Sequence, residues 1–89
     1  MKEKIEEILI KHDPVKLIAM EAPLDEYRQE SILINECVTR HFSTESIHKI
    51  VYDIFIKQFG GERFAPNIVG PFESYLPIAT EIKNLLDEA

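Results

Sequence analysis

The chain lacks several features on which common kinds of protein depend. Its 89 residues include no tryptophan and a single cysteine, Cys37, which cannot form an internal disulfide and fits a reducing cytosol. No stretch approaches the roughly 20 apolar residues that cross a bilayer. The first residues also lack the apolar core of a secretory signal peptide. We therefore expect a cytoplasmic protein with no membrane partner.

Basic residues are also scarce. Ten lysines and arginines stand against sixteen aspartates and glutamates, for a net charge of −6. The excess lies at the two ends, because residues 1–30 carry five basic and eight acidic side chains and residues 60–89 carry two and five. This balance repels a phosphate backbone or an anionic membrane, so we expect no nucleic-acid partner. A basic or neutral protein is easier to reconcile with the charge.

What the chain does contain is apolar residues at three- and four-residue spacing, which is typical of amphipathic helices around a shared core. Asp13 and Pro14 suit the cap and first position of a further short helix. The expected main helices lie near 2–11, 26–41, 44–59 and 75–88. Three glycines and two prolines make 60–73 an irregular loop, which Phe64, Ile68, Val69 and Phe72 would pin to the helices.

The predicted fold is therefore all-α: one domain over residues 1–89, a compact bundle of four main helices plus one short helix after the Asp-Pro motif, with a long irregular loop before the last helix. We expect Ser43 or Thr44 to cap the third main helix, Ser74 to cap the last, and Pro14 to end the first. The expected inner faces of the two middle helices are Leu33, Ile34, Cys37, Val38 and His41, and Ile47, Ile50, Val51, Ile54, Phe55 and Gln58.

The most distinctive stretch runs from His12 to Tyr27. It contains Asp13-Pro14, Leu17, Met20, Ala22-Pro23 and Asp25-Glu26-Tyr27. On these residues and the layout of the following helices, the chain resembles the YugE-like family of small uncharacterised bacterial proteins. Glu21 departs from the small residue expected at its position. The resemblance implies a compact helical fold, and it implies no activity, cofactor or catalytic residue.

Metal and nucleophile chemistry find little support in the sequence. The three histidines, His12, His41 and His48, belong to no His-Glu-x-x-His pattern. Cys37 and His41 are one helical turn apart, but both fall on an expected inner face, where cysteine behaves as a small apolar residue. We expect no catalytic residue, no metal site and no cofactor.

Asp25, Glu26 and Tyr27 form the most conspicuous acidic group. They would present carboxylates and a phenol to a basic partner, together with Phe64 and Asn67 from the 60–73 loop. A structural interpretation is favoured for the first three, because Asp25 would cap a helix, Glu26 would face its positive end, and Tyr27 would anchor the short helix.

The leading functional hypothesis is a small, noncatalytic helical module that binds another protein or itself, through a surface that combines the 60–73 loop with the 22–27 turn. One alternative is a small enzyme or ligand-binding protein with a pocket between that loop and the helices. Another is an immunity or antitoxin protein that covers a basic toxin surface. The pocket alternative requires polar groups to converge, and the candidates are Tyr27, His41, His48, Tyr52 and Tyr75.

Overall fold

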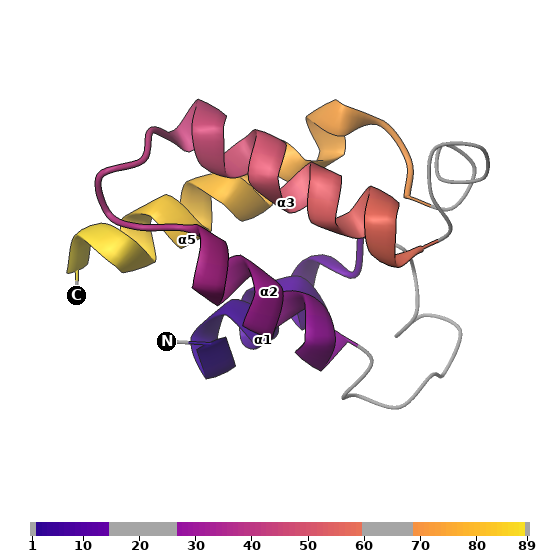
Figure 1. The fold of residues 1–89 in the computed structure, drawn as a ribbon, viewed down its shortest axis with the longest axis horizontal. Helices are drawn as coiled ribbons and strands as arrows, with labels where there is room; N and C mark the ends of the chain where they lie inside the picture. Colours follow the sequence, from indigo (N-terminus) through magenta and orange to yellow (C-terminus); the bar gives the residue numbers. More distant parts are fainter. Residues whose placement is uncertain (1, 15–26, 60–68, 89) are drawn as a thin grey trace.

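The computed structural model describes residues 2–14, 27–59 and 69–88. Over these residues the chain forms α-helices, one 3-10 helix and connecting turns (Figure 1). This confirms the predicted all-α class. The elements are α1 (Lys2–His12), α2 (Arg28–Cys37), α3 (Thr44–Gln58), the 3-10 helix η2 (Phe72–Tyr75) and α5 (Leu76–Glu88).

The four α-helices form a closed ring of neighbours. Helix α1 packs against α2 and α5, and α3 packs against the same two helices from the other side. The N-terminal end of α1 and the C-terminal end of α5 lie on the same side of the molecule (Figure 1), so these two neighbours run antiparallel. None of the described helices is long and apolar enough to cross a membrane.

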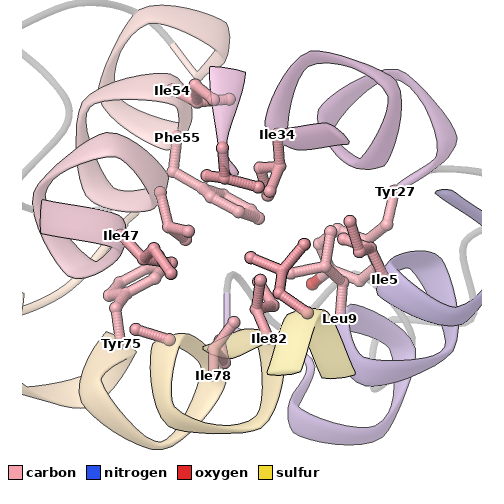
Figure 2. Close-up of a cluster of buried hydrophobic side chains, with 14 of the residues drawn as sticks. Ile5, Leu9, Tyr27, Ile34, Ile47, Ile54, Phe55, Tyr75, Ile78 and Ile82 are labelled. Atoms are coloured by element: carbon pink, nitrogen blue, oxygen red, sulfur yellow. The ribbon is translucent and has the colours of Figure 1, made fainter. Parts of the chain in front are cut away.

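The core lies inside this ring, and every helix contributes to it (Figure 2). Helix α1 contributes Ile5 and Leu9, and α2 contributes Ile34. Phe55 of α3 lies between the rings of Tyr27 and Tyr75, whose centroids are 6.0 and 5.3 Å from its own. Burying a large apolar side chain stabilises a fold by about 1.5–3 kcal/mol. The remaining buried apolar residues are Val38, Ile47, Val51, Ile54, Val69, Ile78, Ala79, Ile82 and Leu86.

Helix α3 follows the sequence prediction closely. Ser43 has extended backbone and its hydroxyl accepts the amide hydrogen of Ser46 at 3.1 Å, which satisfies one of the free amides at the start of the helix. Five of its residues are buried. One expected inner residue, Gln58, is exposed instead, and His48, which was not expected there, is buried.

Helix α2 is shorter than predicted. It ends at Cys37, because Val38 turns to extended backbone (φ −106°, ψ 149°) and carries its own side chain into the core. The Thr39 hydroxyl then accepts the amide hydrogen of His41, a local bond that competes with helix continuation. Cys37 and His41 are consequently exposed, and their predicted place on an inner face was wrong.

Helix α1 ends as Pro14 predicted. Asp13 closes it, because its φ is +47° and its amide donates to the Leu9 carbonyl at 2.8 Å. The short helix expected after Pro14 lies outside the described residues. The role of Asp13 as the cap of that helix therefore stays a prediction.

The last helix is entered through η2. The Ser74 amide donates to the Pro71 carbonyl at 3.1 Å, so Ser74 lies within the 3-10 helix and does not precede α5 as a cap. Pro77 is the second residue of α5, where its missing amide hydrogen breaks no helical bond. Four α5 residues are buried: Ile78, Ala79, Ile82 and Leu86.

Candidate functional site

The structure describes one of the five residues predicted for an interaction surface. Tyr27 is completely buried, and its hydroxyl donates to Oδ1 of Asp13 at 2.7 Å. It therefore ties the residue before α2 to the end of α1 and offers no exposed surface to a partner, while the short helix that it was expected to anchor lies outside the described residues. The other four, Asp25, Glu26, Phe64 and Asn67, lie outside the described residues.

Three of the polar groups named for a pocket do converge, but they converge on the backbone of residues 69–72. The Tyr75 hydroxyl donates to the Val69 carbonyl at 2.7 Å, and the Tyr52 hydroxyl donates to the Gly70 carbonyl at 3.1 Å. Nε2 of His48 lies 2.6 Å from the Phe72 carbonyl oxygen. Because a carbonyl oxygen can only accept, Nε2 carries the proton here.

Aromatic packing reinforces these bonds. The His48 ring stacks on Phe72 with centroids 3.6 Å apart, and Tyr52 meets both Phe72 and Tyr75 edge to face. We call His48, Tyr52 and Tyr75, together with the 69–72 backbone they hold, the aromatic clamp. It confirms that Val69 and Phe72 pin the end of the 60–73 loop. The two hydroxyl groups and Nε2 of His48 are thus used in bonds within the fold.

The residues considered as metal ligands or as a nucleophile also lie apart from one another. His41 is exposed in the turn after α2 and His48 belongs to the clamp. Glu45 and His48 are three residues apart, a spacing seen in helical metal sites, but Glu45 is exposed while His48 is buried. Within the described residues no three histidine, cysteine or acidic side chains gather as metal ligands.

A hollow of about 490 Å³ does lie beside the end of the loop. The described residues around it are His12, Pro14, Val69, Gly70, Pro71, Ser74 and Ile78. None of the five groups named for the pocket alternative is among these described residues, and His48, Tyr52 and Tyr75 converge on the 69–72 backbone instead. Most of the 60–73 loop lies outside the described residues, so the pocket alternative stays a prediction.

A second surface feature, unanticipated in sequence, is an open groove of about 390 Å³ between α1 and α5. Half-buried Ile8 and Leu85 are its apolar residues. Charged and polar side chains surround them: Lys4, Glu7 and Lys11 from α1, and Glu81, Asn84 and Glu88 from α5. We call this feature the α1–α5 groove.

One end of the groove is closed by an ion-pair network. Lys11 Nζ and His12 Nε2 both contact the carboxylate of Glu81, one on each oxygen. Hydrogen bonds from His12 and Lys11 lower the pKa of Glu81 below its ordinary value. The network is partly exposed, so its contribution to stability is modest.

Sequence reasoning did not identify the groove. A signal was present: Lys4, Ile8 and Lys11 recur at helical spacing, as do Glu81, Leu85 and Glu88. Such a pattern does not say which two helices lie side by side; in the structure α1 packs against α5, and Lys11 contacts Glu81.

No family model, curated protein or solved structure matches the chain. The resemblance to the YugE-like family therefore stays a prediction. With no relative to assign a role, the interpretation of the surface depends on its own geometry.

Proposed function

We propose that this protein is a small, noncatalytic helical module that binds another protein through the α1–α5 groove. The observation that carries the proposal is the groove itself: two half-buried apolar side chains, Ile8 and Leu85, surrounded by charged residues of both signs. An apolar centre within a polar rim is the usual anatomy of a protein interface. The aromatic clamp supports the noncatalytic part, because its polar atoms hold backbone carbonyls.

This surface differs from the one the sequence predicted, which combined the 60–73 loop with the 22–27 turn. Tyr27 is buried and most of the other residues of that surface are outside the described part. An immunity or antitoxin role is a special case of the same proposal, in which the partner is strongly basic.

Site-specific photo-crosslinking tests the proposal. A photoreactive phenylalanine analogue replaces Leu85 in the groove, and a control places it at Asp53, which is exposed on α3. We expect a discrete crosslinked product when the analogue is at Leu85 and none when it is at Asp53. Excess chain without the analogue should compete for the partner and reduce the product. Far-UV circular dichroism should be the same for both substituted chains, which would show that both are folded. No adduct at Leu85, or equal adducts at both positions, would count against a groove that binds protein.

A further inference from the structure

The charged residues at the two ends of the α1–α5 groove form two rows of opposite sign, and Glu7 of α1 and Asn84 of α5 complete the polar lining between them. On α1, Lys4 and Lys11 are seven residues apart, which is about two helical turns. On α5, Glu81 and Glu88 have the same separation. Each row therefore has a charged side chain at both ends of the groove, basic on α1 and acidic on α5.

The two rows are level with each other. Lys11 contacts Glu81, and because α1 and α5 run antiparallel (Figure 1), two turns back along α1 and two turns forward along α5 bring Lys4 level with Glu88. Ile8 and Leu85 lie between these two levels, and all six residues line the same groove.

We propose that the partner in the groove is a second copy of this chain. A two-fold axis parallel to the helices places α1 of each copy on α5 of the other at the same level. Lys4 then faces Glu88 of the second copy, Lys11 faces Glu81, and Ile8 faces Leu85, each pair occurring twice. This proposal deepens the proposed function and depends on it.

Charge complementarity favours this occupant over a simply basic helix. A basic helix would meet Glu81 and Glu88 favourably but would oppose Lys4 and Lys11. A complementary partner would place acidic residues opposite α1 and basic residues opposite α5. A second copy related by the two-fold axis does both, because its α5 lies opposite α1 and its α1 lies opposite α5. Self-complementarity of one patch is the defining property of a two-fold interface.

The pairs also form a network at one end. Each Lys11 would lie between Glu81 of its own copy and Glu81 of the other, so that charges of opposite sign alternate around the axis. The apolar area is small, which puts the interface at the low end of protein–protein contacts. We therefore expect a weak dimer that requires a concentration series extending to about 1 mM.

Charge reversal tests this arrangement. Lys4→Glu places four carboxylates at one end of the dimer, and Glu88→Lys places four ammonium groups there. We expect each variant to raise the dimer dissociation constant roughly ten- to a hundredfold in sedimentation velocity of the full chain. Neither change threatens folding, because an acid near the start of α1 and a base near the end of α5 both suit the helix dipole.

Two combinations of these variants should recover dimerisation, and they make the test specific to the proposed charge pairs. The double variant Lys4→Glu with Glu88→Lys restores opposite charges across the axis, so dimerisation should return to within about threefold of the original. An equimolar mixture of the two single variants should form a heterodimer, although each alone is monomeric. Lys49→Glu and Asp53→Lys on the exposed face of α3 make the same changes in net charge and should leave the dimer intact.

A wild-type chain that is monomeric at 1 mM would overturn the proposal, and so would single variants that dimerise as well as the wild type or a mixture that fails to associate. The proposed function fails separately. If Leu85 crosslinks to a different protein while the wild type is monomeric, the groove binds protein but its occupant is not this chain.

Discussion

The aromatic clamp and the α1–α5 groove are two seams of the same ring of helices, and they differ in what their side chains do. In the clamp, three polar side chains donate hydrogen bonds to backbone carbonyls. Their rings also pack, His48 on Phe72 and Tyr52 against both Phe72 and Tyr75. In the groove, the apolar residues stay half-buried and the charges face outward. The comparison shows that a conspicuous side chain such as Tyr75 can be occupied with contacts inside the fold, while an ordinary amphipathic stripe can leave apolar residues half-buried at the surface.

The largest expected effect is on the clamp side. Tyr75→Ala removes a fully buried ring that contacts Tyr52 and Phe55. We expect a loss of about 3–5 kcal/mol in the free energy of unfolding, as for other buried aromatics replaced by alanine. Urea denaturation followed by circular dichroism measures it. A loss below about 1 kcal/mol would mean that the clamp is no tighter than the groove.

A smaller change separates the hydroxyl from the ring. Tyr75→Phe keeps the packing but leaves the buried Val69 carbonyl without its donor, which should cost about 1–3 kcal/mol. Burial, helped by neighbouring Tyr27 and Tyr52, raises the pKa of Tyr75. Its contribution is therefore complete below about pH 10, the ordinary value, and is lost as the pH rises further.

Alkaline titration checks that sign. The stability of the wild type should fall steeply above about pH 10, because the unfolded phenol ionises while the folded one keeps its proton. The Tyr75→Phe variant should show a shallower decline. Parallel curves for the two proteins would show that another group governs alkaline unfolding.

The groove predicts a smaller loss. Leu85→Ala removes a side chain that is only partly buried, so we expect about 1 kcal/mol or less in the monomer, measured at a few micromolar protein. The contrast with Tyr75→Ala sharpens the comparison. If Leu85→Ala lowered the free energy of unfolding as much as Tyr75→Ala, Leu85 would belong to the core and would not be available to a partner in the groove.

The smallest effect is expected at Glu81. Glu81→Gln removes the acceptor for Lys11 and His12 and should lower stability at neutral pH by no more than about 1 kcal/mol. Because the pKa of Glu81 is lowered in the folded state, this contribution is complete above about pH 4.5 and is lost as the pH falls through the folded value. Stability curves from pH 7 to 3 should converge for wild type and variant; a constant gap would assign the loss to packing.

Local patterns were enough to predict the helices. The spacing of apolar residues in 44–58, the Ser43 cap and the proline after Asp13 each act over one or two turns, so their consequences can be read from neighbours in the chain. Where a nonlocal contact competed, the prediction failed: Val38 leaves the helix to reach the core, and Cys37 and His41 are exposed as a result.

By itself, the sequence determined the all-α class, the buried face of α3 and the residues that pin the end of the loop. Only the tertiary structure decided what the surface offers, because that depends on which helices become neighbours. It buried Tyr27 against Asp13, turned His48, Tyr52 and Tyr75 toward the 69–72 backbone, and set the basic row of α1 beside the acidic row of α5. Helical periodicity fixes the faces of a helix, but the packing of all four helices fixes which faces meet.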